Sequence, residues 1–111
     1  MAFGFPARFV ESRKYELREE KLPAVVRSAF ENLGWHGYTT ETNAEFRVSL
    51  RSSLLTWGES FSVSLFPGGT IKAESRCVTG LMPQIFDFGV NRQNVDKFFA
   101  EVERLIAETQ S

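Results

Sequence analysis

The sequence has very few of the residues from which metal and catalytic sites are built: one cysteine, Cys77, and one histidine, His36. A single cysteine excludes an intramolecular disulfide, and one imidazole is too few for a zinc site. A histidine with no carboxylate or cysteine cluster beside it is weak evidence for a general base. We therefore expect no catalytic residues, no metal site, no cofactor and no enzymatic activity. The low cysteine content suits a reducing cytoplasm.

Neither sign of charge is in excess, because 13 basic and 14 acidic residues give a net charge of −1. The whole molecule therefore has no field that would collect nucleic acid, which we do not expect as a partner. No apolar run approaches the ~18 residues of a membrane helix. The first residues also lack the basic and apolar regions of a signal peptide. We expect a soluble protein that neither spans a membrane nor is exported.

Phenylalanine, in contrast, is abundant, with eleven Phe against two Tyr in 111 residues. Aromatic rings without a polar group usually fill a hydrophobic core, and a chain of this length can form one domain, residues 1–111. The alternative is a cavity for an apolar ligand lined by Phe30, Phe61, Phe98 and Phe99.

Hydrophobic periodicity predicts two helices and five strands. Leu22, Val25, Val26, Ala29 and Phe30 follow helical spacing, with Pro23 near the start and Gly34 just past the end. A second apolar stripe runs from Val95 to Ile106, in a helix expected to begin with Asn91 as its N-cap, after a turn containing Asp87. Period-two alternation or short apolar runs predict strands at 8–18, 35–40, 45–51, 60–65 and 70–78.

The expected order is therefore strand, helix, four strands and helix. Each helix has one apolar stripe and each long strand one apolar face, which favours an α+β fold: an antiparallel sheet of four to five strands with two helices on one face. This order resembles one half of the TATA-binding-protein fold. The sequence leaves open whether the first strand lies at the centre or the edge of the sheet.

A motif in the C-terminal half carries a family resemblance. Its matching positions are Ser75, Cys77, Pro83, Gln84, Asp87, Gly89, Asn91 and Asn94. They are similar to the pattern Ser-x-Cys, Pro-Gln-x-x-Asp-Trp-Gly and Asn-x-x-Asn of a group of small uncharacterised bacterial α+β domains, although Phe88 stands in place of the Trp. The resemblance implies the architecture above and no activity.

The outward face of the sheet is the remaining candidate for function. Arg47 and Arg51 on one strand, and Lys72 and Arg76 on another, are expected on the same side, with serines between them. Such a face is either solvated or binds a polar or anionic partner. We expect a non-catalytic binding or regulatory module that uses this face, or a sheet edge, for an unidentified protein partner or for self-association. A small apolar-ligand carrier or minor enzyme is the alternative.

Overall fold

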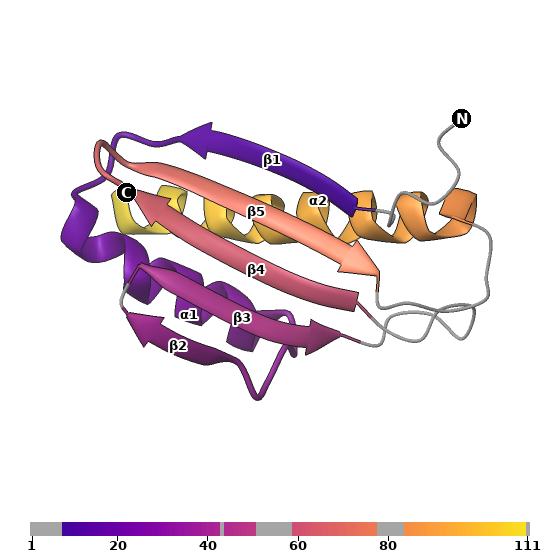
Figure 1. Ribbon diagram of the computed structural model, residues 1–111. Helices are drawn as coiled ribbons and strands as arrows, with labels where there is room; N and C mark the ends of the chain where they lie inside the picture. The colour runs from indigo at the N-terminus through magenta and orange to yellow at the C-terminus, as the bar shows by residue number, and fades with distance from the viewer. Residues whose placement is uncertain (1–7, 43, 51–58, 78–83, 111) are drawn as a thin grey trace.

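The computed structural model describes residues 8–42, 44–50, 59–77 and 84–110. The elements follow the expected order, and the α+β fold is confirmed (Figure 1). They are β1 (Arg8–Lys14), a 3-10 turn (Glu19–Lys21), α1 (Leu22–Asn32), β2 (Thr39–Thr42), β3 (Glu45–Leu50), β4 (Glu59–Phe66), β5 (Thr70–Cys77) and α2 (Gln84–Gln110).

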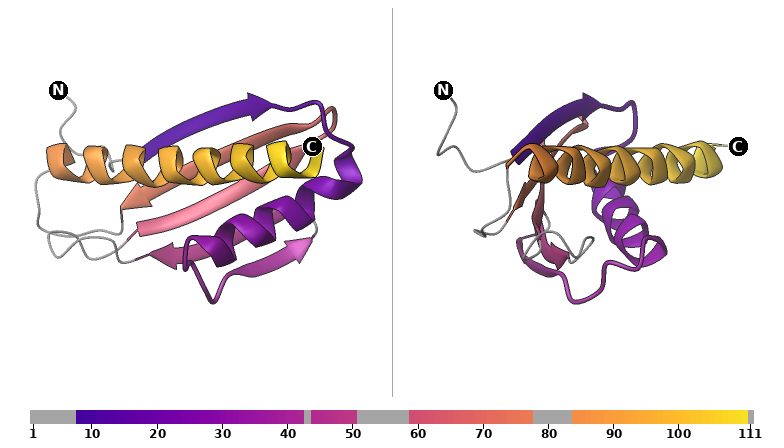
Figure 2. Two further views of the ribbon diagram at one scale, coloured as in Figure 1. Left: turned by 180° about the vertical axis from the view of Figure 1, so that it is seen from behind. Right: turned by 90° about the vertical axis from the view of Figure 1, so that its right-hand side faces the viewer.

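The strands form one antiparallel sheet in the order β1-β5-β4-β3-β2. Both helices cover the same face of this sheet (Figure 2). The first strand therefore lies at an edge, where it pairs with β5 from Arg8 opposite Arg76 to Lys14 opposite Thr70. The opposite edge is β2, whose register with β3 shifts between Thr40 and Thr42.

Two glycines make tight turns between α1 and β2. Gly34 ends α1 with a φ of 77°, and Gly37 has a φ of 80°, so the chain turns twice before β2 begins. The expected strand at 35–40 is wrong for this reason, since only its last residues are extended. Among the residues that the structure describes, no helix is both long and apolar enough to cross a membrane.

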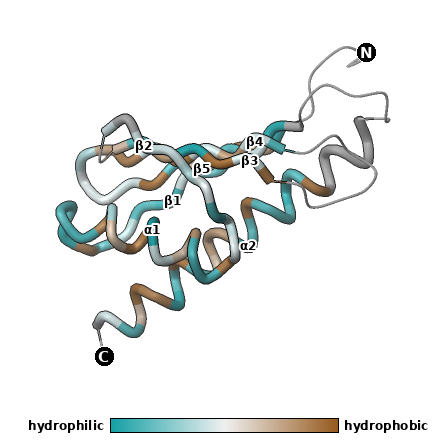
Figure 3. The backbone as a smooth tube through the Cα atoms, turned by 90° about the horizontal axis from the view of Figure 1, so that it is seen from below, coloured by the Kyte–Doolittle hydropathy of each residue, from teal (hydrophilic) through white to brown (hydrophobic). Residues whose placement is uncertain are grey.

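The core lies between the two layers of the molecule (Figure 3). Phe30 of α1, Phe61 of β4, and Phe98 and Phe99 of α2 are each at most 1% exposed. The ring centroids of Phe61 and Phe98, and of Phe98 and Phe99, are both 5.3 Å apart. Phe30 lies 5.8 Å from Phe98 and 6.2 Å from Phe61. Such spacings are those of rings in contact, so these four side chains pack against one another.

The start of α2 corrects one expectation. The helix begins at Gln84, so the backbones of Asp87 and Asn91 lie inside it, and Asn91 is not an N-cap. Gly89 suggested a turn, but a glycine within a helix costs only about 1 kcal/mol, which tertiary contacts outweigh. The Asn91 side chain bonds to the sheet, because Ser75 Oγ donates to Asn91 Oδ1 at 2.7 Å. The Asp87 side chain is outside what the structure describes.

Candidate functional site

The face of the sheet away from the helices is polar. Residues of β3, β4, β5 and β1 that alternate with the buried ones point to this side, and the strand pairing arranges them in rows. One row runs Arg47, Ser62, Glu74 and Val10. The rows on either side of it are Ser49, Ser60, Arg76, Arg8 and Glu45, Ser64, Lys72, Ser12. We call this surface the open face.

The open face is positively charged although the chain as a whole is not. Within the described ranges it carries two acidic residues, Glu45 and Glu74, against five basic ones: Arg8, Lys14, Arg47, Lys72 and Arg76. Serines occupy the middle of β4, where their short side chains leave the surface flat. The face therefore combines a local excess of cations with hydroxyl groups that both donate and accept hydrogen bonds.

A hollow of about 230 Å³ lies at the middle of this face, lined by Arg47, Ser60, Ser62, Glu74 and Arg76. On one side, Arg76 Nη2 lies 3.1 Å from Glu74 Oε2, and Arg8 Nη1 lies 3.7 Å from the same oxygen. On the other side, Arg47 is exposed and has no ion-pair partner among the residues described. Arg76 and Glu74 thus neutralise each other in part, whereas the Arg47 guanidinium remains available to an anionic group of a ligand.

Three of the four predicted binding residues are placed as expected. Arg47 and Arg76 line the same hollow, and Lys72 lies in the next row, opposite Ser64. Arg51 lies outside the described residues. The Arg47 guanidinium, with Ser60 and Ser62 beside it, is suited to hydrogen-bond a carboxylate or another oxyanion.

Within the described ranges there is no group of three His, Cys, Asp or Glu side chains that could hold a metal ion. His36 is exposed on the loop after α1.

A buried polar cluster between the sheet and α2 was not foreseen as a unit. Asn94 Nδ2 donates to Glu59 Oε1 at 3.2 Å and to Ser75 Oγ at 3.1 Å, and Ser75 in turn donates to Asn91. All four residues are at most 1% exposed. The sequence contains a signal for it, because Ser75 alternates in phase with Ile71 and Ala73 on the apolar side of its strand, where a buried hydroxyl needs a partner. Every buried side-chain nitrogen and oxygen in the described part of the chain has one, so this cluster is a structural joint.

A second group of charges fastens β1 to α2. Glu103 Oε2 accepts hydrogen bonds from Arg13 Nη1 at 2.7 Å and from the Tyr15 hydroxyl at 2.8 Å, and Arg13 also pairs with Glu11. The bonds from Tyr15 and Arg13 hold the pKa of Glu103 below its usual value. Burial, together with the neighbouring Glu103 carboxylate, raises the pKa of Tyr15. This group holds the inward-facing charges of the edge strand in fixed positions.

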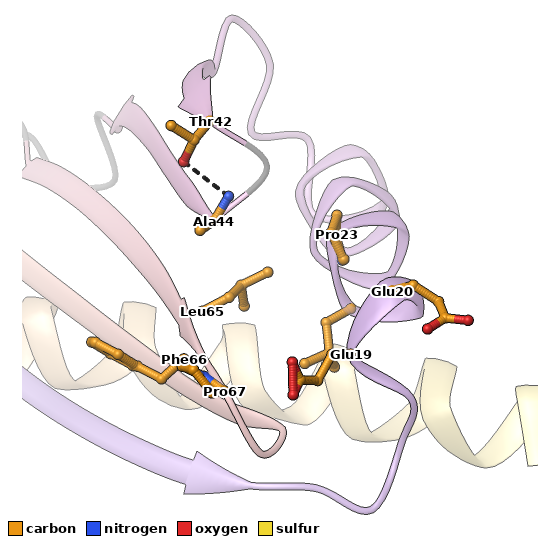
Figure 4. Close-up of a pocket in the computed structure, with 9 residues that line it drawn as sticks. Glu19, Glu20, Pro23, Thr42, Ala44, Leu65, Phe66 and Pro67 are labelled. Carbon is orange, nitrogen blue, oxygen red and sulfur yellow. Dashed lines mark hydrogen bonds between the residues drawn. The ribbon is translucent and has the colours of Figure 1, made fainter.

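A larger hollow of about 530 Å³ lies where the β4 to β5 turn meets the start of α1 (Figure 4). Its apolar lining includes Leu65, Phe66 and Pro23, and Leu65 points into it. Glu19 is held at its rim, accepting a hydrogen bond from Gly68 N at 2.9 Å, while the Glu20 carboxylate points away. This hollow could not be predicted from the sequence, because its lining residues come from three separate segments of the chain.

Comparison of the sequence with protein-family models and with curated proteins found no match.

Proposed function

We propose that the protein is a non-catalytic binding module whose open face binds an acidic segment of a protein partner. The observation that carries this proposal is the hollow in which Arg47, without an ion-pair partner among the described residues, lies beside Ser60 and Ser62. A carboxylate in this position would accept hydrogen bonds from a guanidinium and from hydroxyls together, which is stronger than either alone.

The surroundings of the hollow support an acidic partner. Lys72 and Arg76 on β5, and Arg8 and Lys14 on β1, extend the positive surface across two further strands. Neighbouring strands lie about 4.8 Å apart, so the cations of β3 and β5 are about 10 Å apart across the serines of β4. Acidic residues spaced along an extended peptide can therefore meet both. Because these side chains are exposed, the attraction falls with added salt and contributes more to the association rate than to the lifetime of the complex.

The open face is also rigid, which favours binding without a large loss of entropy. β3, β4 and β5 each pair with a neighbouring strand along both edges, and the opposite face of these strands packs against the hydrophobic core. A surface that is already ordered loses little conformational freedom when a partner docks. The single cysteine suits the cytoplasm as the place where this binding occurs.

A titration of the labelled protein, followed by NMR, tests the proposal. The probes are a glutamate-rich peptide and, as its control, a lysine-rich peptide of equal length. Arg47→Glu should weaken binding of the acidic peptide at least about tenfold, equivalent to about 1.4 kcal/mol. Lys97→Glu makes the same change of charge on an exposed position of α2 and should change affinity about twofold or less. Equal effects of both variants, or shifts that map to the helices, would reject the open face. Tight binding of an oligonucleotide with a steep salt dependence would point to nucleic acid instead.

A small apolar-ligand carrier is the second candidate, and the hollow of Figure 4 favours it more than the Phe rings do, because those rings are in mutual contact. An environment-sensitive apolar dye should bind in this hollow, and Leu65→Asp should abolish that binding. Dye binding that Leu65→Asp leaves unchanged would remove this candidate.

A further inference from the structure

Strand β1 is the edge of the sheet that is open to pairing. The other edge, β2, has four residues and a register shift, features that protect an edge from further pairing. In contrast, β1 has seven residues in unbroken register with β5 and contains no proline. Within the described ranges no other strand pairs with β1. An edge of this length and regularity can accept one more strand.

The direction of its backbone groups shows which residues would make the new hydrogen bonds. Tyr15 N donates to Gly69 O at 2.9 Å, in the same register as the β1 to β5 ladder. In an antiparallel pair, residues bond alternately to one neighbour and to the other. The odd-numbered residues of β1 therefore bond to β5, and the N–H and C=O groups of Val10, Ser12 and Lys14 point away from the sheet.

We propose that β1 pairs antiparallel with β1 of a second copy, with Ser12 on the two-fold axis. In this register Glu11 lies opposite Arg13 of the second copy, and by symmetry the same pair forms twice. Val10, which is 39% exposed, lies opposite Lys14 of the second copy, whose methylene groups cover it. Phe9 lies opposite Tyr15 of the second copy, an aromatic pair on the inward side.

Neighbouring registers are opposed by charge. Centring the pair on Glu11 places the two Glu11 carboxylates together and sets Arg8 opposite Lys14, while centring it on Arg13 places two guanidinium groups together. Arg13 is also fixed in place, because its bond to Glu103 holds it on the inward side where Glu11 of the second copy arrives. Inward-facing charges usually discourage edge pairing. Here they alternate in sign, so they select one register of a self-complementary pair.

The dimer makes one continuous sheet from two five-stranded ones, with the open faces side by side. It would form about six new backbone hydrogen bonds, two at each of three opposed pairs. The interface is narrow, below the ~1,200 Å² of stable complexes, so we expect dissociation in the range of about 10 µM to 1 mM. The backbone edge of β1 is separate from the hollow at Arg47, so the proposed dimer can be tested independently of the proposed function.

Sedimentation velocity over that concentration range tests the dimer with a matched pair of variants. Ser12→Pro removes the N–H at the two-fold axis, which makes no bond to β5, and should leave a folded monomer at every concentration. Ser12→Ala keeps the N–H and should dimerise as the unaltered protein does. A monomer at the highest concentration of the unaltered protein, or a dimer unaffected by Ser12→Pro, would overturn the proposal.

Cysteine cross-linking tests the register and does not depend on how Ser12→Pro folds. In a Cys77→Ala chain, Ser12→Cys places two thiols on residues about 5.5 Å apart between Cα atoms, within the range that a disulfide spans. Oxidation should convert it to a covalent dimer. Val10→Cys should stay monomeric, because its two copies lie about 13 Å apart along the strands. Cross-linking of Val10→Cys in place of Ser12→Cys would refute the register.

Discussion

Replacing Asn94 by Ala tests whether the buried polar cluster holds α2 to the sheet. The Asn94 amide is 1% exposed and donates to Glu59 on β4 and to Ser75 on β5. It therefore ties two neighbouring strands to one helix. Alanine keeps the helix, because it is the best helix former, and removes both hydrogen bonds.

The magnitude follows from the two acceptors. A hydrogen bond to a charged group contributes about 1.5–3 kcal/mol, and one to a neutral hydroxyl contributes about 1 kcal/mol. The gap left by the amide adds to the loss. Water cannot replace the amide freely, because Glu59 is also only 1% exposed. We therefore expect Asn94→Ala to lower the free energy of unfolding by about 3 kcal/mol.

Urea unfolding followed by tryptophan fluorescence measures this loss, because Trp35 lies 4.8 Å from Phe61 between ring centroids and reports on the same core. Gln93→Ala is the control: it is the exposed neighbour on the same helix and should change stability by at most about 0.5 kcal/mol. The effects of changing Asn94 and Glu59 should also be coupled. In a chain that already carries Glu59→Gln, Asn94→Ala should lower the free energy of unfolding by about 1–2 kcal/mol less than it does in the unaltered protein. The reason is that no buried carboxylate then loses its hydrogen-bond donor. A cost for Asn94→Ala below about 1 kcal/mol, or additive effects of the two changes, would refute the account.

Two further predictions concern β1 and its turn. Glu103→Gln weakens the contacts with Arg13 and Tyr15, and because these groups are exposed the loss at neutral pH should stay below about 1 kcal/mol. The pKa of Glu103 is lowered in the folded protein, so its stabilisation is present above the unfolded-state pKa and disappears as the pH falls through the folded-state pKa. The free energies of unfolding of the unaltered protein and of Glu103→Gln should therefore converge as the pH is lowered. A difference that stays constant with pH would contradict this. Gly69→Ala should destabilise far more than Gly68→Ala in thermal melts: both have a positive φ, but a Cβ at Gly69 would collide with the Tyr15 carbonyl, whereas one at Gly68 meets nothing within 4 Å. Similar melting temperatures would contradict the collision.

The layers of the fold could be predicted because burial and periodicity agree in this chain. Phe46, Val48 and Leu50 alternate with exposed residues along β3, and all three are buried as the alternation requires. The apolar positions of α1 likewise fall on its buried face. Where the hydrophobic pattern is strong, the burial of apolar side chains is enough to decide which face of an element points to the core.

The start of α2 and the order of the strands could not be predicted in the same way. Gly89 and Asn91 favour a turn locally, yet the helix continues through them, since the contacts that outweigh local preference are made with β5, distant in the sequence. The edge position of β1 depends on its pairing with β5, and no local pattern encodes it. The candidate site was predicted in part: alternation placed Arg47, Lys72 and Arg76 on one face, but the hollow depends on register. The family resemblance stays a prediction.

The pairing of β1 with β5 also has a consequence for the order of folding. It joins residues at positions 8 and 76, so β1 has no neighbouring strand until about two thirds of these 111 residues have been synthesised. The β4 to β5 hairpin is local and can close within about 1–10 µs, whereas closing the long loop to β1 carries a larger entropic cost. We expect β1 to join the sheet late in refolding and to leave it early in unfolding. Its amide hydrogens should therefore exchange with solvent faster than those of β4, even though both strands belong to the same sheet.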